Sequence, residues 1–357
     1  DLNHRYRIDC LFGSGKMGQV FQATDRLTKT TVAIKRINKT DFFRTQVNTD
    51  APLATALVQE FRNLTSLHHP NIIHVLDFGF DEEQKPYYTM EYLPEPKTIL
   101  EAGLSEPLEY KVELLSQALS ALAYLHRNGI LHRDIKPDNL LVIHNDRLKV
   151  LDFGLSSLRE SVTERAGTPE YMAPEVLSLG KTGPSTDIYA LGVVAYQLFL
   201  GRFPFEAKDA SELVNLILSA SPDFSDCPSA PIAQLLKRWL AKDPDQRYQT
   251  IAELLPELYR IINKTPPAEA LEIRESYSHA AVFVGREYEL GLLKTAFSNM
   301  LIGKGEGWFV AGESGIGKSR LLDEFQTHAL LNGAWVLRGQ AIKEGSTPFT
   351  LWREPLR

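Results

Sequence analysis

The eight residues from 132 to 139 constrain the fold of this chain more than any other segment. They read His-Arg-Asp-Ile-Lys-Pro-Asp-Asn, and an Asp-Phe-Gly triplet begins at Asp152, thirteen positions after Asn139. Asp134 is suited to orient or accept the proton of an attacking hydroxyl group, and Lys136 to stabilise charge on a transferring phosphoryl group. Asn139 and Asp152 offer oxygen ligands to a metal ion. A charged surface turn would not need this register, so the segment predicts a phosphoryl-transfer site.

A glycine cluster near the start of the chain is a second candidate phosphate-handling element. Residues 13–20 fit G-x-G-x-x-G-x-V, and glycines let a backbone approach phosphate groups closely. The pattern alone is weak, because a plain flexible hairpin explains it equally well. Residues 20–24 continue as a strand, whereas a dinucleotide-binding loop would continue as a helix. The nucleotide-binding residues predicted here are Phe12, Gly13, Ser14, Gly15, Lys16, Met17, Gly18 and Val20.

Lys35 is a candidate partner for the α- and β-phosphates of a nucleotide. It ends a predicted strand, Val-Ala-Ile-Lys, at residues 32–35. A lone lysine on a strand is usually a solvated surface residue. Glu60 argues against that interpretation, because it lies on a predicted helix at 57–67 and is suited to form the ion pair that fixes such a lysine.

The apolar periodicity divides the chain into a strand-rich front half and a helix-rich back half. Strands are predicted within 6–25 and at 32–35, 75–77 and 87–91, and helices at 112–125, 188–200, 210–219, 232–240 and 250–262. The Asn-Gly pair at 128–129 is a helix stop. This order predicts two lobes with a cleft between them over residues 5–262, and the polar stretch 263–281 is predicted to be a linker.

Taken together, these motifs resemble the eukaryotic-type protein kinase superfamily, and Ala173-Pro174-Glu175 adds another of its elements. The resemblance implies the bilobal protein-kinase fold, of class α+β, with a β-rich N-lobe and an α-rich C-lobe. It also implies ATP and Mg²⁺ as cofactors. Asp187 is expected to brace the catalytic loop from a buried helix, and Arg247 is expected to pair with Glu175.

The same resemblance assigns the adenine-binding part of the cleft. Met90 is expected to be the gatekeeper, and the residues from Glu91 to Leu93 the hinge that hydrogen-bonds adenine. Ala33 is expected to contact the nucleotide from the neighbouring strand.

Lys136 indicates which hydroxyl groups accept the phosphate. The sequence resembles serine/threonine kinases in carrying a lysine two places after the expected catalytic aspartate. Thr168 agrees, since it is expected to hydrogen-bond Asp134 and Lys136. The predicted partners are therefore ATP and protein substrates with Ser or Thr. Two alternatives stay open: a nucleotide-sensing scaffold with slight catalysis, and a small-molecule kinase. No catalytic residue of the pattern is missing, which disfavours a pseudokinase.

Regulation is expected to involve the loop from 155 to 172. An arginine before the catalytic aspartate, here Arg133, often binds a phosphate on this loop in the family. Ser161 and Thr163 are the candidate phosphorylation sites, and Thr168 is a further regulatory residue. The alternative is that these are ordinary polar loop residues.

A second nucleotide-binding pattern lies near the end of the chain. Residues 312–319 fit G-x-x-x-x-G-K-[ST], after a predicted strand at 308–311 and before a predicted helix. The backbone around Gly312 and Gly317 would cradle phosphates, Lys318 would reach the β- and γ-phosphates, and Ser319 would contact Mg²⁺. With Phe-Val-Gly-Arg-Glu at 283–287, residues 282–357 resemble the incomplete N-terminal part of an AAA- or STAND-like α/β P-loop ATPase.

Bulk properties exclude several other classes. The net charge of −6 argues against a nucleic-acid surface, and no apolar run is long enough to span a membrane. Cys10 and Cys227 lack disulfide or metal spacing, so a reducing, cytoplasmic location is expected. Both ends of the sequence suggest a fragment. Fusions of this form resemble large bacterial signalling proteins, so downstream domains of the same polypeptide are expected partners.

Overall fold

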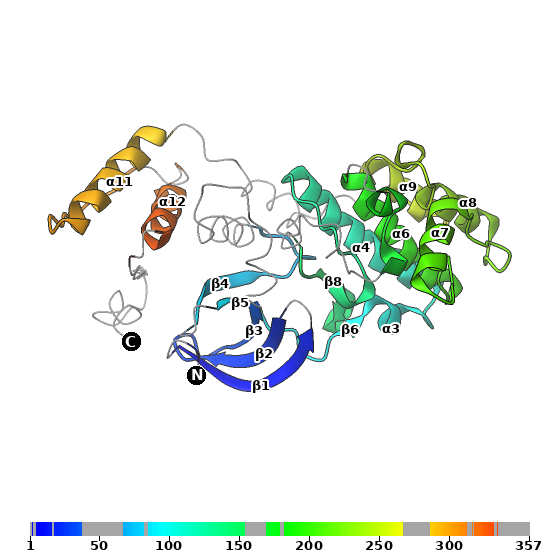
Figure 1. The fold of residues 1–357 in the computed structure, drawn as a ribbon, viewed down its shortest axis with the longest axis horizontal. Coiled ribbons are helices and arrows are strands. Elements are labelled where there is room, and N and C mark those ends of the chain that lie inside the picture. Colours follow the sequence, from blue (N-terminus) through cyan, green and yellow to red (C-terminus); the bar gives the residue numbers. More distant parts are fainter. Residues whose placement is uncertain are drawn as a thin grey trace.

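The computed structural model describes residues 2, 5–15, 18–37, 67–81, 85–153, 169–178, 182–266, 286–312, 316, 318–331 and 334. The first part of the chain forms a five-stranded antiparallel sheet in the order β1-β2-β3-β5-β4 (Figure 1). Its strands are β1 (Tyr6–Gly15), β2 (Gly18–Asp25), β3 (Thr31–Ile37), β4 (Val75–Phe80) and β5 (Pro86–Glu91). The predicted strands of the front half are therefore confirmed.

The first residue of β2, directly after the turn from β1, must be a glycine. Gly18 has a φ angle of +141°, and a Cβ atom there would lie 1.9 Å from the carbonyl oxygen of Arg36. Only a residue without a side chain fits this close approach to β3. The glycine pattern thus forms a strand–turn–strand hairpin, as predicted, and the element that directly follows the turn is strand β2.

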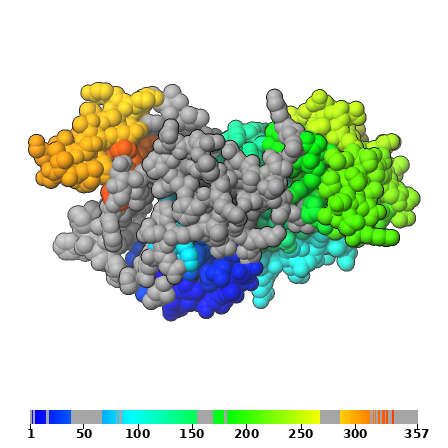
Figure 2. All heavy atoms as spheres, in the orientation of Figure 1, coloured from blue at the N-terminus to red at the C-terminus, as the bar shows by residue number. Residues whose placement is uncertain are grey.

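The second lobe is helical and carries a small sheet on the side that faces the strand lobe (Figure 1). Its helices are α3 (Ile99–Gly103), α4 (Leu108–Arg127), α5 (Pro174–Leu177), α6 (Pro184–Leu200), α7 (Ala210–Ser219), α8 (Ala230–Trp239) and α9 (Ile251–Arg260). The small antiparallel sheet consists of β6 (Lys97–Thr98), β7 (Leu140–Ile143) and β8 (Arg147–Val150). In the space-filling view the strand lobe (blue) and the helical lobe (green) occupy separate parts of the surface (Figure 2).

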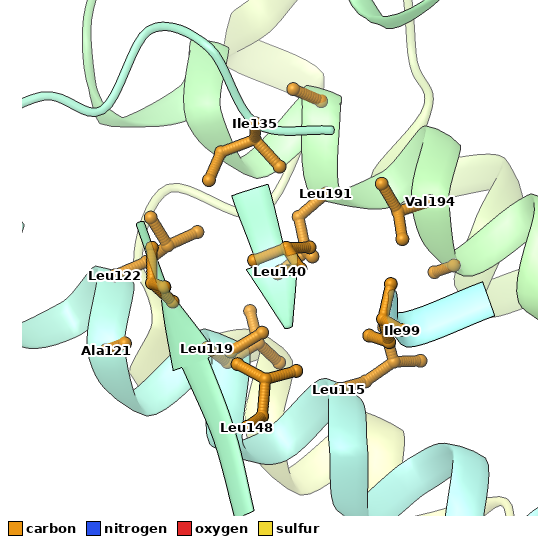
Figure 3. Close-up of a cluster of buried hydrophobic side chains, with 14 of the residues drawn as sticks. Ile99, Leu115, Leu119, Ala121, Leu122, Ile135, Leu140, Leu148, Leu191 and Val194 are labelled. Carbon is orange, nitrogen blue, oxygen red and sulfur yellow. The ribbon is translucent and has the colours of Figure 1, made fainter. Parts of the chain in front are cut away.

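Helices α4 and α6 form the centre of the helical lobe. On α4 the buried residues follow one stripe, whereas α6 is buried on nearly all sides from Thr186 to Phe199. A helix that is apolar all round belongs in a core. Side chains of both helices meet those of β7 and β8 in one cluster, and Ile135 of the catalytic loop points into it (Figure 3). The core therefore anchors the segment 132–139 through Ile135.

Two boundaries show how local signals set helix ends. Helix α4 ends at Arg127, and Gly129 follows with a φ angle of +71°, which confirms the predicted stop. Helix α6 begins at Pro184, four residues before the predicted start. Proline is favoured in the first turn because it lacks an N–H, and the Thr186 hydroxyl accepts a hydrogen bond from the N–H of Gly183.

The last part of the chain contributes α11 (Glu287–Leu301) and α12 (Lys318–Leu331), which pack together through Phe297 and Phe325, with ring centroids 6.3 Å apart. The predicted strand at 308–311 is wrong in this structure, because residues 304–312 pair with no strand in the described part of the chain and Phe309 is 92% exposed. A strand needs a hydrogen-bonding neighbour.

The predicted helix at 57–67 lies outside the described residues except for Leu67. Among the helices that the structure describes, none is long and apolar enough to cross a bilayer.

Candidate active site

The segment 132–139, which is expected to be the catalytic loop, is held by hydrogen bonds to Asp187 on α6. This buried carboxylate accepts hydrogen bonds from the backbone N–H groups of His132 (2.8 Å) and Arg133 (2.7 Å), and it contacts His126 Nε2 at 2.8 Å. Burial by itself would raise the pKa of Asp187, but the hydrogen bond and charge of His126 lower it overall. Arg133 has a left-handed φ of +63°, and hydrogen bonds hold the backbone N–H groups of His132, Arg133 and Asp134 around it. The predicted bracing role of Asp187 is confirmed.

His132 links the catalytic loop to the segment before Asp152. Its ring is fully buried, and burial lowers its pKa. Nδ1 accepts the backbone N–H of Asp134 at 3.3 Å, and Nε2 donates to the carbonyl oxygen of Leu151 at 2.8 Å. These contacts assign the neutral Nε2–H tautomer. The ring therefore fixes the spacing between the two segments that carry Asp134 and Asp152.

Asp134, Lys136 and Asn139 gather at the end of the catalytic loop. Lys136 Nζ lies 3.1 Å from Asp134 Oδ2, and Asn139 Nδ2 donates to the same oxygen (3.1 Å) and to the Asp134 carbonyl (2.7 Å). With its Nδ2 so engaged, Asn139 presents Oδ1, which accepts no hydrogen bond among the described residues. The arrangement combines a carboxylate, a cation and an available amide oxygen.

The hairpin of β7 and β8 brings Asn139 and Asp152 to the same end of the small sheet. Asn139 directly precedes β7, Asp152 follows β8, and Leu140 faces Val150 across the two strands. The backbone N–H of Leu151 donates to the carbonyl of Asn139 at 2.9 Å. Two residues thirteen positions apart thus lie side by side in the backbone, and both carry side-chain oxygens of the kind that a hard divalent cation such as Mg²⁺ prefers.

Asp152 lies at one of the contacts between the two lobes. Its Oδ2 lies 2.5 Å from Nζ of Lys35 on β3, and its Oδ1 accepts a hydrogen bond from the hydroxyl of Tyr88 on β5 at 3.2 Å. Burial would raise the pKa of Asp152, but the charge of Lys35 and these two hydrogen bonds hold it below its usual range. The carboxylate is therefore ionised and able to bind a cation. Burial and the nearby Asp152 raise the pKa of Tyr88, which keeps its hydroxyl protonated.

The predicted adenine hinge follows the end of β5. Met90 is buried and pairs with Ala33 across β3 and β5. The carboxylate of Glu91 is engaged by Lys149 Nζ at 2.7 Å, and its backbone N–H donates to the carbonyl of His74 at 3.0 Å. The N–H of Leu93 has no hydrogen-bond partner among the described residues.

An aromatic pair spans from the glycine hairpin to the hinge. The rings of Phe12 and Tyr92 are stacked, with centroids 5.8 Å apart and an interplanar angle of 12°. Both residues lie in segments expected to bind nucleotide, Phe12 in the glycine hairpin and Tyr92 within the hinge 91–93, but their stacking was not predicted. Sequence reasoning missed Tyr88 and His126, which carry no local motif.

Several predicted site residues lie outside the described part of the chain: Lys16, Met17, Glu60, Ser161, Thr163, Thr168 and Gly317. The predicted Lys35–Glu60 ion pair is among these expectations. Within the hairpin, Gly13 faces Val20, Ser14 faces Gln19 and Gly15 faces Gly18.

Glu175 and Arg247 form a buried ion pair that supports the helical lobe. Arg247 Nη1 and Nη2 donate to the two carboxylate oxygens of Glu175 at 2.8 and 2.7 Å. The guanidinium also donates to the carbonyls of Ala241, Lys242 and Ser185. The predicted pairing is confirmed, and the structure adds the carbonyl partners.

The P-loop pattern opens α12. Lys318 Nζ donates to the carbonyl of Gly312 at 2.8 Å, so the lysine folds back over the start of the loop. Arg286 donates to the carbonyl of Ile316 at 3.0 Å, a contact that sequence reasoning missed. For Ser319 the structure describes only its backbone, in the first turn of α12.

Comparisons with known proteins agree with this geometry. The model of the protein kinase domain family matches residues 6–259, and that of the AAA ATPase domain family matches residues 282–357. Among curated relatives, the serine/threonine-protein kinase PrkC of Bacillus subtilis is 33% identical over 265 residues, covering 71% of this chain and 40% of PrkC.

Two further relatives are similar. Serine/threonine-protein kinase pkn3 of Myxococcus xanthus is 31% identical over 302 residues, covering 79% of this chain and 54% of pkn3. Serine/threonine-protein kinase PknB of Mycobacterium leprae is 30% identical over 281 residues, covering 74% of this chain and 44% of PknB. The chain thus spans about half the length of the curated relatives it matches.

Proposed function

Because the chain belongs to the protein kinase domain family, we propose that residues 5–262 transfer the γ-phosphoryl group of ATP to Ser or Thr hydroxyls of protein substrates. The observation that carries the proposal is the clustering of Asp134, Lys136 and Asn139 in one loop and of Asp152 at the end of the neighbouring strand, with Lys35 of the strand lobe in contact with Asp152. Proteins of this family use ATP and a divalent metal ion, and the oxygen donors here favour Mg²⁺.

Each side chain has a distinct task in this proposal. Asp134 would hold the acceptor hydroxyl and receive its proton, while Lys136, 3.1 Å away, would offset charge on the phosphoryl group. Lys35 would turn from Asp152 to the α- and β-phosphates. Asn139 Oδ1 and Asp152 would hold Mg²⁺, which when bound neutralises phosphate charge. Lys136 also favours Ser and Thr as acceptors over Tyr.

The remaining parts of the proposal concern the whole protein. Residues 263–281 would link the kinase domain to a P-loop ATPase module over 282–357, with Gly312, Gly317 and Lys318 around phosphate and Ser319 on its metal ion. Such a fusion is suited to signalling. A cytoplasmic location fits the two free cysteines, Cys10 and Cys227.

The proposal is tested by incubating residues 1–357 with Mg²⁺, labelled ATP and a generic basic protein, followed by phosphoamino-acid analysis. We expect phosphoserine and phosphothreonine, lost on addition of EDTA and in Asp152→Asn. Tight nucleotide binding without any transfer would favour the nucleotide-sensing scaffold instead. Transfer to a small molecule but to no protein would favour the third candidate class.

Regulation by loop phosphorylation is a further expectation that involves Arg133. Its side chain is exposed and makes no hydrogen bond or ion pair among the described residues, so it is available to a phosphate on Ser161 or Thr163. After incubation with ATP, peptide mass spectrometry should find phosphate within 155–172. Phosphatase treatment should then lower the transfer rate several-fold in the wild type but not in Arg133→Met. An active enzyme that carries no phosphate in this loop would contradict the prediction.

A further inference from the structure

The hydroxyl of Tyr88 contacts the carboxylate that the proposed mechanism assigns to the metal ion. Tyr88 lies on β5 directly opposite Lys35 on β3, and both side chains reach the same residue from neighbouring strands. Tyr88 donates to Oδ1 of Asp152 at 3.2 Å, and Lys35 contacts Oδ2 at 2.5 Å. The two carboxylate oxygens are therefore held by two different donors.

These two donors differ in what happens to them when nucleotide binds. Lys35 carries a charge, and the phosphates of ATP are its proposed partner, so its contact with Oδ2 is exchangeable. The Tyr88 hydroxyl is neutral and its ring is packed in the main core, where the residue is only 3% exposed. It therefore stays on Oδ1 while Oδ2 is released. A hydrogen bond from a neutral hydroxyl orients the carboxylate and leaves its negative charge available to a cation.

Backbone geometry makes such support necessary. Asp152 has a left-handed φ angle of +57°, a conformation that is costly for a residue with a side chain unless its surroundings hold it. The Leu151 carbonyl before it is fixed by His132, and the carboxylate after it is fixed from β5. His132 thus restrains the backbone before Asp152, and Tyr88 restrains the Asp152 side chain.

We propose that Tyr88 is a positioning residue that orients the Asp152 carboxylate for the metal ion. The inference rests on the proposed function, because it takes Asp152 as the metal ligand. Hydrogen-bond partners of metal ligands typically contribute 10- to 100-fold to metal affinity. Since the hydroxyl at 3.2 Å is at the long end of hydrogen bonding, we expect removal to cost about tenfold.

The experiment compares Tyr88→Phe with Tyr189→Phe. Both substitutions delete one hydroxyl from a buried ring, but the Tyr189 hydroxyl has no hydrogen-bond partner in the described part of the chain. Mg²⁺ is titrated by calorimetry into each protein with a non-hydrolysable ATP analogue. The half-saturating Mg²⁺ concentration should rise about tenfold in Tyr88→Phe and stay at the wild-type value in Tyr189→Phe.

The same titration in an Asp152→Asn background isolates the pair. There, adding Tyr88→Phe should shift the Mg²⁺ midpoint much less, because the ligand that the hydroxyl orients has been changed. A wild-type Mg²⁺ midpoint in Tyr88→Phe, or an undiminished shift in the Asp152→Asn background, would overturn the inference. Absence of phosphoryl transfer by the wild type would instead refute the proposed function, and the binding titration would still decide the role of Tyr88.

Discussion

Asp134→Asn is expected to lower kcat for phosphoryl transfer by about 10²–10⁴-fold, the range that general-base groups contribute. The amide has the same shape and still accepts hydrogen bonds from Lys136 and Asn139, which lie 3.1 Å from Oδ2, so the loop should keep its fold. What is lost is the negative charge that orients the acceptor hydroxyl. Initial rates over a range of ATP concentrations give the measurement, and KM for ATP should change little.

Asp138→Asn is the matched control for this prediction. It makes the same chemical change four residues away in the same loop, at an exposed side chain outside the proposed catalytic cluster. Its kcat should remain within about twofold of the wild-type value. If Asp134→Asn and Asp138→Asn transferred phosphate equally fast, Asp134 would not be the residue that handles the acceptor.

Arg247→Met is expected to lower the free energy of unfolding of the kinase domain by about 3–5 kcal/mol, the cost of removing one partner from a buried ion pair. The Arg247 side chain is 0% exposed, so the substitution leaves the Glu175 carboxylate and three carbonyl oxygens without their cation. For a domain of this size the melting temperature should fall by about 6–20 °C. Thermal and urea unfolding followed by circular dichroism measure the effect.

Arg260→Met provides the comparison on the surface. Arg260 pairs with Glu257 on α9 at 2.8 Å, but its side chain is 71% exposed, and such pairs contribute little. Adding Glu175→Gln to Arg247→Met should recover part of the loss, because the unpaired buried charge is then removed. Equal melting temperatures for the Arg247 and Arg260 variants would show that the buried pair does not support the lobe.

The cluster of Asp134, Lys136 and Asn139 was predictable because all three residues lie in one short segment. Lys136 and Asn139 both contact Asp134 and lie within five positions of it. Strands and helices of the kinase domain were predictable for a similar reason, since apolar periodicity and glycine or proline at the ends act locally. The predicted start of α6 is four residues late because the apolar run that predicts the helix begins at Ile188, whereas the helix itself begins at Pro184.

Contacts between segments that are distant in the sequence could not be predicted from local patterns. Tyr88 and Asp152 are separated by 64 positions, and His126 and Asp187 by 61. No local pattern distinguishes the tyrosine that contacts Asp152 from any other strand tyrosine. The strand expected at 308–311 failed for the same reason, because a strand depends on a neighbour that the segment itself does not contain.

By itself the sequence identified the residues that we propose carry the chemistry of this protein: the segment 132–139, the aspartate of the triplet at 152, and Lys35. These identities and spacings are local, and the chemistry requires them. Only the tertiary structure decided how they meet. Pairing of β7 with β8 brings Asn139 close to Asp152. Asp187, on the buried helix α6, accepts a hydrogen bond from the segment 132–139. Strands β3 and β5 bring Lys35 and Tyr88 to the two oxygens of the Asp152 carboxylate. Long-range packing sets these distances, and packing is a property of the folded chain as a whole.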